Sequence, residues 1–187
     1  MLESKTLATV APPEVRPTSG LAIQDQVVEL FDELRVPLLR YLSGFPLSVP
    51  DSEDIIQEAF LALFEHLGRG GSHPNIRGWL FRTAHNLALK KRLRVRRNGG
   101  PALEMGLARD VAIDPAPNPE VQLASHQTRE RLMAVVRALP EQNRWCLYLR
   151  AEGLRYREIA AVLDISLGSV ALYLERSLAL VARAAER

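Results

Sequence analysis

The residue types best suited to chemistry in this 187-residue chain are concentrated in one basic segment, WLFRTAHNLALKKRLRVRR, at positions 79–97. The segment contains seven lysine and arginine residues and no acidic residue. Each cation that neutralises a phosphate releases counterions, so such a segment binds nucleic acid without reading its sequence. Trp79 and Phe81 offer aromatic faces for unpaired bases, and His85 and Asn86 offer polar groups for base edges. The alternative interpretation is that Trp79 belongs to the core and the charges form a solvated face.

A second candidate nucleic-acid site lies at positions 153–178, GLRYREIAAVLDISLGSVALYLERSL. The pattern predicts two short helices joined by a tight turn at Asp164, the shape of a helix-turn-helix. Ser166 is the expected N-cap of the second helix. The apolar spacing predicts that the second helix buries a stripe of Val170, Leu174 and Leu178. Arginine, lysine, asparagine and glutamine read base edges, but the predicted outward face instead carries Ala171, Leu172, Tyr173 and Glu175.

The sequence offers no arrangement for catalysis, metal binding or cofactor binding. The four histidines have no metal-ligand spacing, no glycine-rich phosphate loop precedes a helix, and no nucleophile stands beside a base. The single cysteine, Cys146, excludes an internal disulfide and fits a reducing compartment. No apolar run approaches the length of about 18 residues that a membrane span needs, and the first residues lack a signal peptide. We expect a soluble cytoplasmic protein that is not an enzyme and has no membrane span.

The elements that must position these segments are helical. Residues 1–20 contain little to bury and are expected to form a disordered tail. A first helical domain at 21–97 follows, in which Pro37 is expected to kink or divide the first helix and Asp51 to cap the second. Apolar periodicity predicts its helices at about 21–42, 51–67 and 75–97.

Glycine, proline and weak periodicity at 98–119 indicate a flexible linker. A second helical domain at 120–187 is expected to contain helices near 120–138 and 141–152 before the helix-turn-helix. The predicted fold class is therefore all-α, with two small helical domains joined by a linker.

Three segments together resemble a known family: DSEDIIQEAFLALFEHL at 51–67, NIRGWLFRTAHNLALKKRLRVRR at 75–97, and the sequence from LPEQNRW to ALVAR at 139–183. In this order they resemble a bacterial RNA polymerase sigma factor of the extracytoplasmic-function (ECF) class of the sigma-70 family. The resemblance covers most of residues 22–98 and 120–185. It implies that the chain binds core RNA polymerase and directs promoter-specific transcription initiation, without a cofactor.

The resemblance assigns two sets of site residues. A region 2-like domain would dock on the clamp helices of the large polymerase subunit and melt promoter DNA near the minus-ten element. A region 4-like domain would read the minus-thirty-five element. The expected polymerase contacts are Asp51, Asp54, Gln57, Glu58 and Phe60. The expected DNA contacts are Arg77, Trp79, Arg82, His85, Asn86, Lys90, Lys91, Arg94, Arg97, Arg155, Ser166, Gly168, Ser169, Ala171, Leu172, Tyr173 and Arg176.

The chain departs from the family pattern at three places. Lys90 stands where the family usually has an acidic residue, Asp164 replaces the usual turn glycine, and Ala171 and Tyr173 replace basic or polar residues. Aspartate tolerates the left-handed turn conformation, so we expect the fold to survive. Base reading by the second domain is expected to be weak, which shifts the main DNA-binding prediction to 79–97.

Two alternative functions remain open: a polymerase-binding adaptor with weakened promoter reading, and a helix-turn-helix regulator that acts without polymerase. The presence of an anti-sigma partner is also open. A linker of roughly twenty residues reaches roughly 70 Å when extended. We expect an extended linker in the working complex and domains packed together otherwise.

Overall fold

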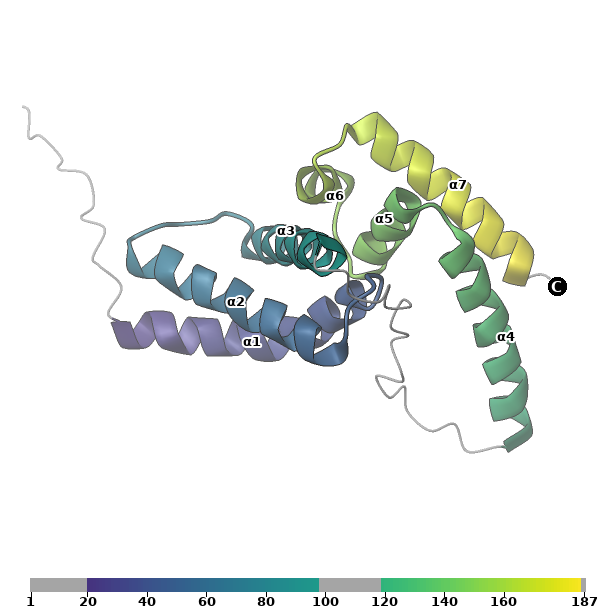
Figure 1. Cartoon of the computed structure of the whole chain (residues 1–187), viewed down its shortest axis with the longest axis horizontal. Helices are drawn as coiled ribbons and strands as arrows, with labels where there is room; N and C mark the ends of the chain where they lie inside the picture. Colours follow the sequence, from purple (N-terminus) through teal and green to yellow (C-terminus); the bar gives the residue numbers. More distant parts are fainter. Residues whose placement is uncertain (1–19, 98–118, 186–187) are drawn as a thin grey trace, which may run out of the picture.

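The computed structural model describes residues 20–97 and 119–185, with side chains described at 20–97 and 129–185. Within these ranges every regular element is a helix, so the expected all-α fold class is confirmed. Most of the expected N-terminal tail and linker lies outside the described residues. In chain order the helices labelled in Figure 1 are α1 (Gly20–Leu42), α2 (Val49–Gly68), α3 (Ile76–Arg97), α4 (Pro119–Ala138), α5 (Glu141–Ala151), α6 (Tyr156–Leu163) and α7 (Leu167–Ala185).

Helices α1, α2 and α3 form the first unit, a bundle around an apolar core. Figure 1 shows α1 and α2 running side by side, with α3 packed against them. Helix α1 continues through Pro37 as one helix, so the proline does not divide it. Leu34 and Leu38 flank this proline and are both buried, which holds the helix in place despite the missing backbone N–H. The core of the first unit includes Leu34, Leu38, Tyr41, Leu42, Ile56, Leu63, Leu80 and Phe81.

Helix α2 begins earlier than the sequence suggests, because Ser48 and not Asp51 is its N-cap. Ser48 has an extended backbone, and its side-chain oxygen accepts a hydrogen bond from the Asp51 N–H at 3.2 Å. The Ser48 hydroxyl in turn donates to the Asp51 carboxylate at 2.7 Å. Pro50 fits the first turn, where no intrahelical N–H bond is lost. Asp51 therefore lies inside the first turn, near the positive end of the helix dipole.

Helices α4 to α7 form the second unit, in which α7 packs along α4 and α5. The turn between α6 and α7 follows the sequence expectation. Asp164 adopts the left-handed conformation at φ 54° and ψ 47°, and the Ser166 side chain accepts a hydrogen bond from the Ser169 N–H at 3.0 Å. The axes of α6 and α7 are bent by 105°. The helix-turn-helix with an aspartate turn and a serine cap is confirmed.

The predicted buried stripe of α7 is correct at Val170 and Leu174 but wrong at Leu178. Leu178 is 50% exposed, and Ser177 is buried in its place. The buried side chains of α7 are Val170, Leu174 and Ser177. Their spacing of four and then three residues matches the helical repeat, so they lie in a line on one side of the helix. Leu178 lies one residue beyond that line and is rotated away from the core.

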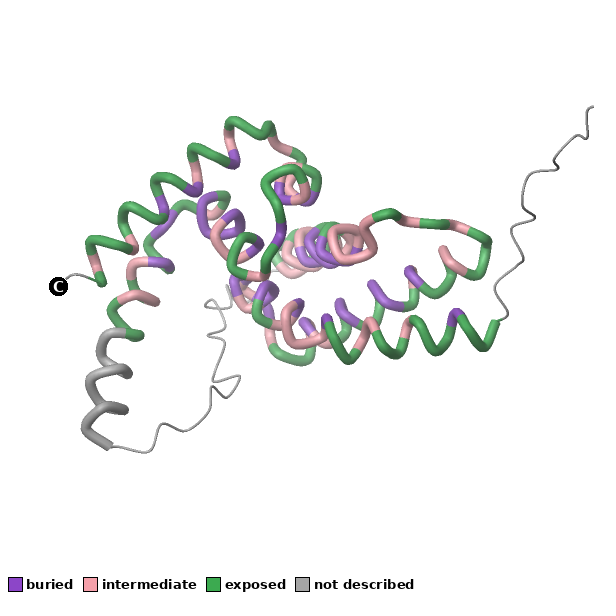
Figure 2. The backbone as a smooth tube through the Cα atoms, turned by 180° about the vertical axis from the view of Figure 1, so that it is seen from behind, coloured by how far each residue is buried: buried purple, intermediate pink, exposed green. Residues whose placement is uncertain are grey.

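The two units pack against each other and share one continuous core. Buried positions line the facing sides of the helices in both units (Figure 2). The Phe45 ring, just after α1, stacks on Trp145 of α5 at a centroid distance of 5.2 Å. The Arg40 guanidinium donates two hydrogen bonds to the Glu152 carboxylate, each at 2.8 Å. The described residues therefore adopt a compact arrangement in which α5 and α6 cover part of the first unit.

Candidate nucleic-acid interface

Helix α3 presents a basic face to solvent. It begins after Asn75, whose side-chain oxygen accepts a hydrogen bond from the Gly78 N–H at 2.9 Å. Five of the predicted DNA contacts then recur every three or four residues, which brings them onto one side of the helix. All five are exposed: Arg82, Asn86, Lys90, Arg94 and Arg97. This exposed α3 face has the chemistry to bind phosphates and to hydrogen-bond one base edge.

The structure places His85 and Phe81 on the opposite, buried side of α3. The His85 Nδ1 atom lies 2.7 Å from the Tyr41 hydroxyl oxygen, and the His85 ring meets the edge of Trp145 at a centroid distance of 4.9 Å. Burial, with a smaller contribution from the Arg92 charge, lowers the pKa of His85 to about 4. The expectation that these two rings present themselves to unpaired bases is therefore not met in this arrangement, because α1 and α5 enclose them.

Two further predicted DNA contacts, Trp79 and Arg77, lie at the start of α3 and are half-buried. The Trp79 ring stacks on the His66 ring at a centroid distance of 5.8 Å. The Arg77 guanidinium donates to the backbone carbonyl of Glu152 at 2.6 Å and forms an ion pair with Glu33 at 3.4 Å. Arg77 is thus a contact between the two units, which no local sequence pattern indicates.

Helix α2 presents the predicted polymerase contacts on its solvent side, with one exception. Asp54, Gln57 and Glu58 are exposed, and Asp51 is half-buried. Phe60 is 5% exposed, and its ring packs edge-on against Phe31 at a centroid distance of 5.1 Å. The assignment of Phe60 as a surface contact is corrected, since it lies on the side of α2 that carries Ile56, Ala59 and Leu63.

Sequence reasoning missed two exposed apolar residues on the acidic side of α2. Leu61 is 59% exposed and Phe64 is 42% exposed. The series Asp54, Glu58, Leu61 and Phe64 advances by four, three and three residues, and that helical spacing would have identified the two apolar members. Acidic and apolar side chains thus share one face of α2, which suits a partner that is both basic and apolar.

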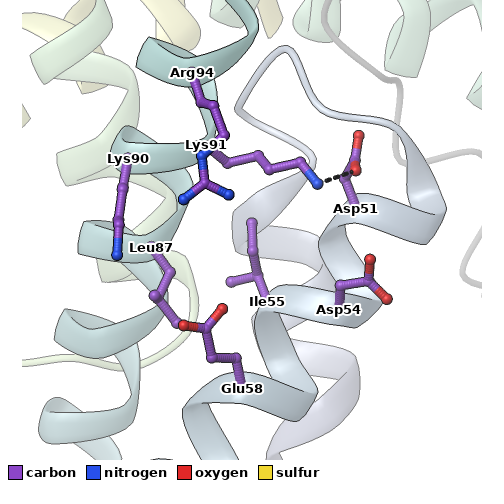
Figure 3. Close-up of a pocket in the computed structure, with 8 residues that line it drawn as sticks. All are labelled: Asp51, Asp54, Ile55, Glu58, Leu87, Lys90, Lys91 and Arg94. Atoms are coloured by element: carbon purple, nitrogen blue, oxygen red, sulfur yellow. Dashed lines mark ion pairs between the residues drawn. The ribbon is translucent and has the colours of Figure 1, made fainter.

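The acidic side of α2 and the basic side of α3 meet in a cleft of about 230 Å³ (Figure 3). Ile55 and Leu87 form its apolar part. The Lys91 Nζ atom lies 2.6 Å from an Asp51 carboxylate oxygen, so this ion pair joins α3 to α2 at the cleft. The hydrogen bonds from Lys91 and then from Ser48 hold the pKa of Asp51 below its usual value. The charged residues lining the cleft are Asp51, Asp54, Glu58, Lys90, Lys91 and Arg94.

The face of the helix-turn-helix is only partly as predicted. Ser169 is half-buried and its hydroxyl lies 2.9 Å from that of Ser166. Tyr173 is half-buried and packs partly against the core, because it lies four residues before buried Ser177 on the same side of α7. The predicted contacts that are exposed here are Arg155, Ser166, Gly168, Ala171, Leu172 and Arg176. Two arginines and two serines at most supply polar groups, so this face is short of base-reading side chains.

Among the residues that the structure describes, no group of three or more histidine, cysteine or acidic side chains could hold a metal ion. In the same part of the chain no single helix is long and apolar enough to cross a membrane, and the only combination that reaches this length and composition is the sharply bent pair α6 and α7.

The fold and the site define a two-unit helical protein with a helix-turn-helix and a basic helix, the class of a nucleic-acid-binding protein. Two known protein families match segments of this chain. The family Sigma-70 region 2 matches residues 30–98, and the family Sigma-70, region 4 matches residues 129–181. The chain belongs to the ECF class of the sigma-70 family of RNA polymerase sigma factors. Members of this family direct transcription initiation, and the family is not enzymatic.

Individual relatives agree with this assignment. The chain is 34% identical to the ECF RNA polymerase sigma factor SigE of Mycolicibacterium smegmatis, covering 90% of this chain and 68% of the relative. It is 30% identical to the ECF RNA polymerase sigma-E factor of Escherichia coli K12, covering 64% of this chain and 66% of the relative. It is 33% identical to a probable RNA polymerase sigma factor RfaY of Xanthomonas campestris, of which it spans 34%.

A solved structure shares the fold. CnrH in complex with the cytosolic domain of CnrY aligns with a TM-score of 0.57, covering 88% of this chain and 90% of CnrH. The sequence identity of 21% makes this a likeness of fold alone.

Proposed function

We propose that this chain binds core RNA polymerase in the bacterial cytoplasm and directs transcription initiation at specific promoters. In this proposal residues 21–97 form the domain that binds polymerase and melts DNA, and residues 120–187 form the domain that contacts duplex DNA, with 98–119 as the linker. The observation that carries the proposal is the meeting of an acidic helix face and a basic helix face at one cleft, inside the segment that matches region 2.

The polymerase-binding surface is the solvent side of α2. Asp54, Gln57 and Glu58 offer hydrogen-bond acceptors and negative charge to a basic helix, as the clamp helices of the large subunit would require. Leu61 and Phe64 lie on the same side and add apolar area to the contact. Phe60 contributes indirectly, because its packing against Phe31 fixes α2 on α1.

The DNA-binding surface begins with the exposed α3 face. Its arginines and lysine hold the backbone of an unpaired strand, while Asn86 reaches a base edge. Arg77 and His85 lose contacts once the second unit moves away, because Arg77 donates to the Glu152 carbonyl and His85 meets the edge of Trp145 in the compact arrangement. Trp79 stacks on His66 within the first unit. Opening of the two units is therefore part of the proposed mechanism.

The second unit contributes mainly phosphate contacts. Arg155 and Arg176 are exposed and cationic, and the N-terminus of α7 offers backbone N–H groups to a phosphate. Ala171 and Leu172 offer no hydrogen bond to a base. They favour a second candidate function, a polymerase-binding adaptor with weak promoter reading. An anti-sigma partner that holds the two units together is the proposed inhibitor, supported by the CnrH fold, which was solved with CnrY.

The test is reconstitution with purified core polymerase and a library of promoter fragments. We expect a stable complex and promoter-dependent transcripts. Reversal of charge at two exposed acids, D54K and E58K together, should weaken polymerase binding about tenfold or more, since both groups face the partner. The matched control is D25K with E29K, which reverses two exposed acids on α1.

The other outcomes are distinct. A polymerase complex without transcripts from any promoter identifies the adaptor. Promoter binding that needs no polymerase, with no complex formed, identifies an independent helix-turn-helix regulator. Equal weakening by the α1 control would show that the acidic side of α2 is not the docking surface.

A further inference from the structure

The ion pair between Asp51 and Lys91 joins two residues that belong to different surfaces. Asp51 lies on α2 among the proposed polymerase contacts, and Lys91 lies on α3 among the proposed DNA contacts. Their charged atoms are 2.6 Å apart, and their side chains are only 23% and 33% exposed. Figure 3 shows the Lys91 side chain extended across the cleft toward Asp51 and not outward from α3. In this position Lys91 is withdrawn from the exposed α3 face.

We infer that Asp51 is a positioning residue that holds Lys91 inside the α2–α3 cleft, and that a basic side chain of polymerase replaces Lys91 at Asp51 and releases it to DNA. The inference rests on the proposed function and adds a coupling between its two binding surfaces. Polymerase binding on α2 would thereby add one cation to the DNA-binding surface of α3.

Asp51 is well prepared to act as a fixed counter-ion. The Ser48 hydroxyl donates to one carboxylate oxygen at 2.7 Å, and the Asp51 N–H donates to the Ser48 oxygen, so the side chain is oriented by the cap of α2. The Lys91 ammonium binds the other oxygen. An aspartate is ionised at neutral pH, and the hydrogen bonds from Lys91 and Ser48 lower the pKa of Asp51 further. This carboxylate is therefore a permanent acceptor for one cation.

Repulsion from the neighbouring cations favours the ion pair of Lys91 with Asp51 as long as no other cation competes for Asp51. Lys90 and Arg94 line the same cleft, so Lys91 is surrounded by like charge on its own helix. Arg92, the next residue, is paired with Glu141 of the second unit. Within the part of the chain that the structure describes, Lys90 and Arg94 form no ion pair. Of the seven cations in the basic run, Lys91 and Arg92 are therefore paired within the protein, and the exposed Arg82, Lys90, Arg94, Arg96 and Arg97 are available to DNA.

The cleft also explains how a competitor would be drawn in. Asp54 and Glu58 line it, are exposed, and form no ion pair within the described ranges 20–97 and 119–185. A basic side chain that enters beside them meets three carboxylates along one helix side, of which only Asp51 is neutralised. Exchange at Asp51 leaves the total number of ion pairs unchanged, so it requires no unpaired carboxylate.

The restraint on Lys91 is tested on the full free chain with a fluorescein-labelled single-stranded DNA oligonucleotide. Affinity is measured by anisotropy over a series of salt concentrations for wild type, D51N and D54N. D54N is the matched control, because it removes the same charge from an exposed residue of the same helix. We expect D51N to bind about three- to tenfold more tightly than D54N, with a salt slope steeper by about 0.7, as one added phosphate contact requires.

Two further variants separate the ion pair from the fold of α2. Addition of K91Q to D51N should abolish the gain in affinity. F31A weakens the packing of α2 on α1 and changes no residue that lines the cleft, so it should leave the salt slope unchanged. Equal slopes for D51N and D54N, or a gain that survives K91Q, would overturn the inference.

The exchange itself is tested by repeating the measurement with core polymerase added. We expect the difference between wild type and D51N to disappear, since polymerase releases Lys91 in the wild type. A polymerase complex in which the difference persists overturns the exchange and leaves the proposed function intact. Absence of any polymerase complex in a direct binding assay overturns the proposed function and the exchange together, while the free-chain comparison still decides whether Asp51 restrains Lys91.

Discussion

Acid should weaken this fold through His85, and the size of the effect follows from where the ring lies. His85 is enclosed by Tyr41, Phe45 and Trp145, and this burial lowers its pKa from 6.5 to about 4. A histidine whose folded pKa is depressed stabilises the folded chain above its unfolded pKa, and this stabilisation is lost as the pH falls from 6.5 toward 4. At about 1.4 kcal/mol per pKa unit, the full effect is about 3 kcal/mol.

The perturbation is therefore a change of pH combined with His85→Gln. Glutamine does not titrate, and its amide retains a hydrogen-bonding group for the buried Tyr41 hydroxyl. Between about pH 7 and about pH 5, the wild type should lose about 2 kcal/mol more unfolding free energy than the variant, measured by urea denaturation at each pH.

The comparison isolates His85 because the other three histidines are present in both proteins. Asp51 does not interfere: its folded pKa lies below its ordinary 3.8, so its stabilisation is lost only when the pH falls through 3.8 and below. Parallel pH profiles for wild type and H85Q would refute the reasoning, because they would mean that His85 titrates alike in the folded and unfolded chain.

Two further predictions concern the second unit and its contact with the first. S166A should lower the unfolding free energy by about 1 kcal/mol, because the variant lacks the oxygen that accepts the Ser169 N–H; chemical denaturation measures this, and an equal loss in S72A, an exposed serine outside the helices, would contradict it. F45A should lower the unfolding free energy by about 3 kcal/mol, because it removes the ring that stacks on Trp145. Small-angle scattering should then show a larger radius of gyration, whereas F64A, which truncates an exposed ring, should not change it. Loss of stability in F45A with unchanged scattering would show that the two units stay together without this stack.

Sequence reasoning succeeded where one local interaction decides the structure. Asp164 and Ser166 act on residues within one turn, so their roles follow from the chain alone. It failed where two local solutions compete. Ser48 and Asp51 are both good N-caps, and the earlier one is used because Pro50 suits the first turn. The misplacement of Phe60 and Leu178 has a similar cause, since the helix or core that covers a helix decides which of its side chains are buried.

The contacts between the units were beyond the sequence for a different reason. His85 and Trp145 are sixty residues apart, and neither has a local pattern that points to the other. The same is true of the basic run. Its positive charge is obvious from composition, but the fact that Lys91 and Arg92 are paired with Asp51 and Glu141 depends on how three helices pack. A run of like charges in the sequence therefore predicts the sign of the surface, but it does not predict how many of those charges are free to bind a partner.

This distinction bears on how α3 engages DNA. Its exposed face carries cations and one amide, which give affinity for a backbone, while the aromatic and histidine groups that could hold bases are half-buried or covered. The compact protein can therefore bind the DNA backbone through this face. Base capture requires two contacts between the units to break: Arg77 with the Glu152 carbonyl, and His85 with Trp145. The groups that bind the backbone and the groups that could hold bases lie on different faces of α3. The free chain should therefore bind single strands weakly and with little sequence preference. Sequence preference should appear only when the units are held apart, as they would be on polymerase.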